Sequence, residues 1–213
     1  MLRIEATDLM HATRRPHPFS DKDWLYEWKY DGFRCLVRKR GVSVELISKQ
    51  GKPFNGSFPD IEAAVAVVPG DFVWDAELAV GDAKGSASFA RLQTRARISL
   101  AKNVVAAARQ QPARLYVFDM LASAKVDLRN QPLIERKARL RDCFENTDTL
   151  VFSSSVIGAG TEIFSLVREY GFEGMVAKRL ASPYRAGRSL DWIKIKDRNY
   201  ERRAALGWGA SST

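Results

Sequence analysis

Lys29 is the residue whose sequence setting most strongly suggests a chemical role, because it stands between two carboxylates in a short aromatic stretch. The stretch runs from Glu27 to Arg34 and reads Glu-Trp-Lys-Tyr-Asp-Gly-Phe-Arg. Aromatic residues that alternate with polar ones predict a strand, and Gly32 is expected to interrupt it. Since successive side chains of a strand point to opposite faces, Lys29 is expected to share a face with Glu27 and Asp31.

A lysine in this setting has two interpretations. Taken alone, the row is more often a solvated set of ion pairs on an edge strand. The alternative is a nucleophile, whose neutral amine attacks a phosphorus atom or a carbonyl carbon and forms a covalent intermediate. The stretch itself does not decide between them, and the deciding observations lie further along the chain.

Three more predicted strands also present charged side chains on one face. These side chains belong to Asp75 and Glu77, to Glu173, and to Lys194 and Lys196. If the strands share one sheet or two facing sheets, several carboxylates and several amines meet in one cleft. Carboxylates with room for water suit Mg²⁺ or Mn²⁺, and lysines beside Arg34 would neutralise a triphosphate. Each set alone would be a solvated strand face, so their joint occurrence is what favours a site.

The expected elements are those of an α+β domain with mostly antiparallel sheets flanked by helices. Strands are expected over residues 27–38, 42–47, 72–80, 115–121, 172–178 and 192–196, and helices over residues 59–67, 86–110, 132–145 and 161–170. A tight turn at residues 38–41 predicts a hairpin between the first two strands. Residues 11–23 are expected to form an irregular basic segment, and residues 199–213 a loose tail.

The charge balance of the chain restricts its partners. Among 213 residues, 34 are Lys or Arg and 25 are Asp or Glu, which gives a net charge of +9. Such an excess favours a polyanion, nucleic acid before a membrane, although it also fits a protein that is merely basic. The two cysteines, Cys35 and Cys143, lack the spacing of a zinc site or a disulfide framework, so a reducing cytoplasm is expected. No apolar run approaches membrane-spanning length.

Several competing motifs are missing or incomplete. The chain has no G-x-x-x-x-G-K-[ST] loop, which excludes a P-loop nucleotide site. Gly158 and Gly160 begin a G-x-G pattern without its third glycine, which disfavours a dinucleotide fold. The only histidines, His11 and His17, lie too near the start of the chain to favour a Ser-His-Asp triad.

Taken in order, the polar motifs resemble those of the covalent nucleotidyltransferases, which comprise ATP-dependent DNA ligases, RNA ligases and mRNA-capping guanylyltransferases. The segment from Lys29 to Arg34 resembles the K-x-D-G-x-R signature of this family. The other matching segments are Ser48–Lys52, similar to an S-R-N-G-like loop; Asp75–Glu77, similar to D-G-E; Val117–Asp119, similar to an aromatic strand; and Glu173–Lys178 and Trp192–Lys196, similar to the last two adenylation motifs. The likeness covers about residues 8–196 and is strongest for the ligase domain of bacterial non-homologous end-joining ligases.

This resemblance implies an ATP-grasp-like adenylation domain over residues 1–198 and a role for each matching residue. Lys29 would form a lysyl-AMP phosphoramidate and release pyrophosphate. The nucleotide would be held by Glu27 near the adenine, by Arg34 and Glu77 at the ribose, by Phe118 against the purine, and by Lys49, Glu173, Lys178, Lys194 and Lys196. The metal ligands would be Asp75, Glu77 and Glu173. The AMP would then pass to the 5′-phosphate of nicked or broken double-stranded DNA, and a 3′-hydroxyl would displace it.

Two departures from the family pattern are visible. Lys49 stands where the family loop has arginine, which keeps the charge but loses the bidentate geometry toward phosphate. The sequence also ends soon after Lys196, so the C-terminal OB-fold of the family is expected to be absent. Either the chain is a minimal or trimmed adenylation domain, or a separate protein supplies an OB-fold or an end-binding function. A monomer is expected.

Two alternatives stay open at the level of sequence. One is an RNA ligase or capping-type enzyme, for which RNA substrates or the use of GTP would be diagnostic. The other is a non-catalytic basic module that only binds nucleic acid. The intact set of charged residues argues against the second, because a lapsed site has no physical need of them.

Overall fold

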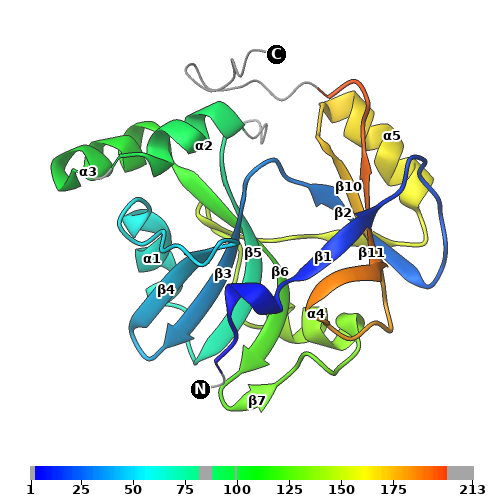
Figure 1. Cartoon of the computed structure of the whole chain (residues 1–213), viewed down its shortest axis with the longest axis horizontal. Helices are drawn as coiled ribbons and strands as arrows, with labels where there is room; N and C mark the ends of the chain where they lie inside the picture. Colours follow the sequence, from blue (N-terminus) through cyan, green and yellow to red (C-terminus); the bar gives the residue numbers. More distant parts are fainter. Residues whose placement is uncertain (1–2, 82–87, 99, 201–213) are drawn as a thin grey trace.

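Two β-sheets face one another in the structure, a computed structural model that describes residues 3–81, 88–98 and 100–200 (Figure 1). The first sheet has the spatial order β1 (Met10–Arg14), β11 (Gly187–Lys196), β10 (Gly174–Arg179), β2 (Trp24–Lys29) and β9 (Ser155–Ile157). The second has the order β4 (Ser43–Ser48), β3 (Phe33–Arg40), β5 (Phe72–Val80), β6 (Ala113–Ser123) and β7 (Val126–Asp127), with β8 (Leu150–Phe152) also paired to β6. Only β1–β11 and β6–β8 pair in parallel among the described strands, which confirms the predicted α+β class with mostly antiparallel sheets.

Five α-helices flank these sheets in the part of the chain that the structure describes. They are α1 (Pro59–Ala66), α2 (Phe89–Ala96), α3 (Ala101–Gln110), α4 (Leu133–Arg141) and α5 (Gly160–Tyr170), preceded by a short 3₁₀ turn at Ala6–Asp8. Helix α5 packs on the first sheet, whereas α1, α2 and α4 pack on the second (Figure 1). None of the described helices is long and apolar enough to cross a membrane.

A shared apolar cluster joins the two sheets on one side. It combines Met10 and Trp192 of the first sheet with Leu36, Val73 and Leu121 of the second, and all five are buried. Burying a side chain of this size contributes roughly 1.5–3 kcal/mol. The cluster therefore fixes the distance and orientation between the sheets, which decides where polar side chains on their facing surfaces meet.

Gly32 marks the point where the chain passes from the first sheet to the second. The predicted break of the strand at this residue is confirmed, with β2 ending at Lys29 and β3 beginning at Phe33. A Cβ atom at Gly32 would lie 2.3 Å from the carbonyl oxygen of Leu78, so no larger residue fits without a shift of backbone. The crossing places Lys29 on one sheet and Arg34 on the other.

Other local predictions are confirmed where the signal is strong. The hairpin of β3 and β4 forms, and α5 ends at Gly171, whose φ of 68° lies in the left-handed region that glycine adopts most readily. Helix α1 begins at Pro59, and its first turn carries acidic residues that suit a helix N-terminus.

Four local predictions are wrong and have physical reasons. The segment 11–23 is not wholly irregular, because β1 pairs with β11, a distant partner that leaves no local signal. The helix expected over 86–110 is two helices, the first of which begins after Ser88, whose hydroxyl accepts from the Arg91 amide; residues 86 and 87 lie outside the described residues. Helix α4 ends at Arg141 rather than at residue 145. Asp31 lies beyond the end of β2 and is buried, with Tyr200 donating to its carboxylate, rather than sharing a strand face with Lys29.

The predicted tail lies largely outside the described residues, which end at residue 200. The domain boundary at residue 198 and the nature of the segment after it therefore stay predictions.

Candidate active site

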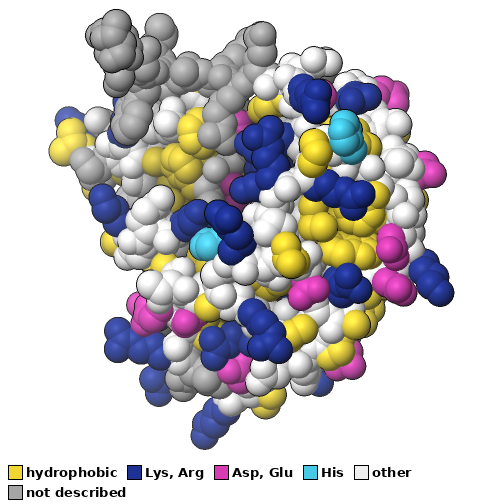
Figure 2. All heavy atoms as spheres, turned by 45° about the vertical axis from the view of Figure 1, so that its right-hand side comes forward, with side chains coloured by type: hydrophobic (Ala, Val, Ile, Leu, Met, Phe, Trp, Pro, Cys, Tyr) yellow, Lys and Arg dark blue, Asp and Glu magenta, His cyan; other side chains and the backbone are white. Residues whose placement is uncertain are grey.

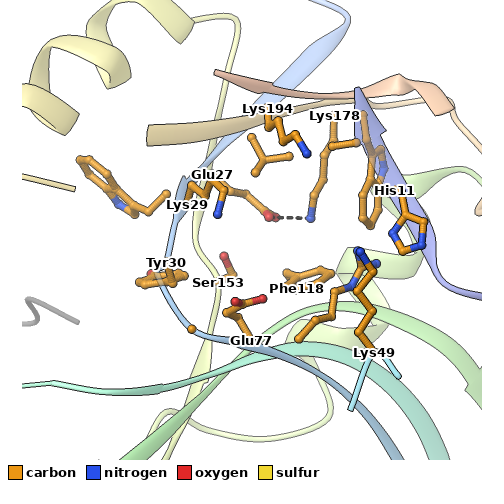
Figure 3. Close-up of a pocket in the computed structure, with 16 residues that line it drawn as sticks. His11, Glu27, Lys29, Tyr30, Lys49, Glu77, Phe118, Ser153, Lys178 and Lys194 are labelled. Carbon is orange, nitrogen blue, oxygen red and sulfur yellow. Dashed lines mark hydrogen bonds and ion pairs between the residues drawn. The ribbon is translucent and has the colours of Figure 1, made fainter. Parts of the chain in front are cut away.

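A cavity of about 320 Å³ opens between the two sheets, and predicted site residues from both sheets line it (Figure 3). Those that line it are Glu27, Lys29, Arg34, Lys49, Glu77, Phe118, Lys178 and Lys194. The volume is within the range of small-molecule sites, which begins at about 300 Å³. Asp75, Glu173 and Lys196 do not line this cavity. Asp75 forms an ion pair with Arg34 and Glu173 forms one with Lys29, and both of these partners line the cavity. Lys196 forms an ion pair with Glu173.

Lys29 lies at the end of β2 with its amine in contact with Glu173. Lys29 Nζ donates to Glu173 Oε2 at 2.6 Å, and Lys196 contacts the other carboxylate oxygen. The register explains the meeting, because Gly174 of β10 lies opposite both Lys29 and Lys196, and Glu173 precedes it directly. Burial alone would raise the pKa of Glu173, but the two lysines lower it below its ordinary value.

Arg34 is held by two buried residues, Asp75 of β5 and Tyr184 of the segment between β10 and β11. Its Nε donates to Asp75 Oδ1 at 2.8 Å, and Tyr184 Oη donates to Asp75 Oδ2 at 2.6 Å. Asp75 is fully buried and both of its oxygens are engaged. The predicted role of Asp75 as a metal ligand therefore does not fit, and the carboxylate instead fixes the guanidinium at the cavity wall.

Glu77 reaches the cavity from β5. Among the described residues, no donor forms a hydrogen bond or ion pair with its carboxylate. Burial raises the pKa of Glu77 to about 7, although Lys29 and Arg34 act in the opposite direction. Such a carboxylate can accept from a ribose hydroxyl or face a cation, and it exchanges its proton near neutral pH.

The predicted metal set is not assembled. Within residues 3–81, 88–98 and 100–200, no group of three or more His, Cys, Asp or Glu side chains could hold a metal ion. The lysines engage Glu173 and Arg34 engages Asp75, so Glu77 alone of the three remains available. Mg²⁺ commonly binds through one or two carboxylates together with phosphates and waters, and the single carboxylate of Glu77 is compatible with that ligand set.

Aromatic rings and a buried ion cluster form the inner wall (Figure 3). Lys178 Nζ lies 4.2 Å from the centroid of the Phe118 ring and 4.3 Å from that of Trp192. The same amine donates to Glu27 Oε2 at 2.6 Å, and Lys137 contacts the other oxygen of Glu27. The half-buried Phe118 ring beside fixed polar groups is an arrangement that suits a planar heteroaromatic base.

Several cationic side chains line the same cavity (Figure 3). Burial lowers the pKa of Lys194, and Lys29, Lys196 and Lys49 lower it further. The pKa of His11 is lowered for the same reasons, by burial and then by Arg34 and Lys49. Crowded cations with depressed pKa values favour the binding of an anion such as a polyphosphate, which relieves their mutual repulsion.

Sequence reasoning missed several residues of the site. His11 and Ser153 line the cavity, and so do Trp28 and Tyr30, which were expected on the face opposite Lys29. The signal for His11 was absent because its strand was not predicted. Lys137 belongs to the basic face of a predicted helix, and nothing in that pattern distinguishes it from its solvated neighbours.

Fold and site together define a nucleotidyltransferase-type adenylation domain, in which a lysine faces a nucleotide-sized cavity between two sheets. The matching family model is described as "ATP dependent DNA ligase domain" and covers residues 7–196. The chain therefore belongs to the family of ATP-dependent DNA ligase domains.

Relatives with curated names agree with this assignment. The "Multifunctional non-homologous end joining protein LigD" of Pseudomonas aeruginosa is 34% identical over 178 residues, which are 82% of this chain and 20% of that protein. A "Probable DNA ligase" of Dictyoglomus thermophilum is 31% identical over 182 residues, which are 82% of this chain and 31% of that protein. The chain thus spans a fifth to a third of the length of these relatives.

Solved structures show the same fold. The ligase domain of Mycobacterium tuberculosis LigD superposes with a TM-score of 0.77 at 27% identity, over 92% of this chain and 61% of that chain. A mycobacterial DNA ligase D complexed with ATP and MES gives a TM-score of 0.76 at 26% identity, over 92% of this chain and 62% of that chain.

Proposed function

We propose that this chain is the adenylating unit of an ATP-dependent DNA ligase and that Lys29 is its nucleophile. The observation that carries the proposal is the position of Lys29, whose side chain is 20% exposed, lines the cavity and contacts Glu173 at 2.6 Å. An amine that served only a surface ion pair would not need to line a nucleotide-sized cavity.

The first chemical step forms a phosphorus–nitrogen bond. The Lys29 ammonium gives one proton to water, and its neutral amine attacks the α-phosphorus of ATP while the bond from that phosphorus to the oxygen that bridges to the β-phosphate breaks. The electron pair of that bond leaves with pyrophosphate. The attacking nitrogen then gives a second proton to water, and a lysyl-AMP phosphoramidate remains. Glu173 is the carboxylate that orients Lys29 before the attack, since it holds the amine at the cavity edge.

The remaining site residues bind the nucleotide in this scheme. Phe118 offers the ring for the purine, Arg34 and Glu77 lie where a ribose would follow, and Lys49 and Lys194 supply charge for the phosphates. A bound Mg²⁺ or Mn²⁺ would supply charge neutralisation at the phosphates, with Glu77 as its protein ligand. Lys196 supports the site through Glu173.

The acceptor in the second step is the 5′-phosphate of a DNA break. AMP passes from Lys29 to that phosphate and frees the amine, and a 3′-hydroxyl then attacks the activated phosphate and expels AMP. The net charge of +9 suits a polyanion, and Lys and Arg side chains gather across the middle of the face shown in Figure 2. The named LigD relatives act in non-homologous end joining, which makes broken double-stranded DNA the expected substrate.

Three further expectations belong to this proposal. We expect the chain to work in the cytoplasm, where two unpaired cysteines persist. We expect it to be a monomer. We expect a separate OB-fold or end-binding protein to increase sealing, as a lid over the cavity would exclude water.

The test is the fate of the AMP group. Protein labelled with radioactive AMP is separated from free ATP and offered nicked DNA, nicked RNA or no nucleic acid. Discharge of the label to nicked DNA supports the proposal, and discharge to RNA alone favours an RNA ligase. Salt-sensitive DNA binding without any labelled protein would identify a non-catalytic module and overturn it.

A further inference from the structure

A buried cluster of two lysines and one glutamate lies against the inner wall of the cavity. Lys137 of α4 contacts Glu27 Oε1, and Lys178 of β10 donates to Glu27 Oε2 at 2.6 Å. All three residues are at most 4% exposed. Glu27 and Lys178 line the cavity and are part of the predicted site, whereas Lys137 does not line it and belongs to none of the sequence motifs.

Lys137 anchors Glu27 from outside the cavity. Its amine also donates to the carbonyl oxygen of Ser153 at 2.9 Å and lies 4.6 Å from the centroid of the Phe152 ring. Each oxygen of Glu27 thus has one lysine donor, which fixes the plane of the carboxylate. A carboxylate oxygen can accept more than one hydrogen bond, so each keeps capacity for a ligand donor.

The charge of the cluster matters as much as its geometry. Two amines share one carboxylate, because Lys137 and Lys178 both form an ion pair with Glu27. Burial lowers the pKa of Lys178, and Lys137 lowers it further, while Glu27 opposes this change. Lys178 makes one hydrogen bond to an acceptor among the described residues, so its remaining N–H groups can serve a ligand.

A purine that contacts Phe118 therefore meets one fixed acceptor and one donor. The acceptor is the Glu27 carboxylate, and the donor is Lys178 Nζ, 4.2 Å from the Phe118 ring centroid. Adenine presents a donor at its 6-amino group beside an acceptor at N1, which complements this pair. Hypoxanthine and guanine present an acceptor at O6 beside an N1–H donor, which places like groups together unless Glu27 turns.

We propose that Lys137 is a positioning residue that makes the site selective for adenine over 6-oxopurines by holding the Glu27 carboxylate in one orientation. The inference rests on the proposed function, since it needs a nucleotide that binds through its base in this cavity. Without Lys137, Glu27 would keep only Lys178 as a partner and could turn to accept from N1–H of a 6-oxopurine.

The experiment compares Lys137→Met and Lys137→Arg with the wild type. The measured quantity is kcat/KM for formation of the covalent nucleotide adduct with ATP and with ITP, which differs from ATP in carrying a 6-oxo group. We expect K137M to lower the preference for ATP over ITP by about tenfold or more, the range of one charged hydrogen bond, and K137R to restore it. A general loss of structure would lower both rates together and leave their ratio unchanged.

Controls separate the possible failures. Lys102→Met, on the exposed side of α3, is expected to leave the ratio and both rates unchanged. If K137M does not fold, as judged by thermal unfolding, Lys137→Gln removes the charge and takes its place. An unchanged ATP-to-ITP ratio in the folded variant overturns the role of Lys137. Absence of any adduct in the wild type instead overturns the proposed function on which it rests.

Discussion

Replacing Glu77 by glutamine should stabilise this protein above neutral pH while impairing its chemistry. Glu77 is the cavity carboxylate that has no hydrogen-bond or ion-pair partner among residues 3–81, 88–98 and 100–200, and burial raises its pKa from an ordinary 4.5 to about 7. At about 1.4 kcal/mol per pKa unit, ionising it in the folded state costs up to about 3 kcal/mol relative to the unfolded chain. Glutamine has nearly the same shape and carries no charge, so it avoids this cost.

The sign of the pH dependence follows from the direction of the change. A carboxyl group with a raised pKa binds its proton more tightly in the folded state, so stability is lost as pH rises. The loss begins above the unfolded value of 4.5 and is complete above the folded value of about 7. The stability of Glu77→Gln relative to wild type should therefore grow across this window and stay constant above it.

The assay is urea unfolding of both proteins at about pH 5 and about pH 8, with the difference in unfolding free energy at each pH. A gain of about 3 kcal/mol corresponds to roughly 6–12 °C in Tm for a chain of this size. Glu169→Gln on the exposed side of α5 is the matched control and should show no such growth. A difference for Glu77→Gln that does not grow with pH would refute the reasoning, and adduct formation should fall in this variant because the ribose or metal contact is lost.

Three further changes test other parts of the site. Arg34→Met should destabilise the protein by about 3–5 kcal/mol, because Asp75 and Tyr184 stay buried without their cation; urea unfolding measures this, and a cost below about 1 kcal/mol would contradict it. Phe118→Ala should weaken ATP binding by about 5- to 150-fold through loss of base stacking, as measured by calorimetry. The imidazole of His11 should titrate below its ordinary pKa of 6.5 and move upward when ATP is added, because phosphates offset the neighbouring cations; NMR titration that shows no upward movement would exclude contact with the phosphates.

The sequence predicted those site residues whose strands show a clear alternation of polar and apolar residues. Lys29, Glu77 and Lys194 each alternate with apolar residues, and this period places them on one face of a strand without knowledge of its partners. Because the two sheets face one another, all three side chains line the cavity between them. The resemblance of the motifs supplied the identity of the nucleotide.

The parts that the sequence could not predict depend on contacts between distant segments. Strand β1 pairs in parallel with β11, 177 or more positions further along the chain, so His11 has no local sign of its place in the cavity. Asp75 and Glu77 have the same local pattern, yet Arg34 and Tyr184 engage one and leave the other open. Lys137 becomes distinct from other basic residues of α4 only when Glu27 lies beside it.

The most direct test of the account is the intact mass of the protein after incubation with ATP and Mg²⁺. Wild type is compared with Lys29→Ala and with Lys29→Arg, whose guanidinium keeps its charge but does not give up a proton near neutral pH. We expect one added AMP on wild type, located at Lys29 by peptide mapping, and none on either variant. An AMP adduct on a variant, or on another residue of the wild type, would contradict Lys29 as the nucleophile.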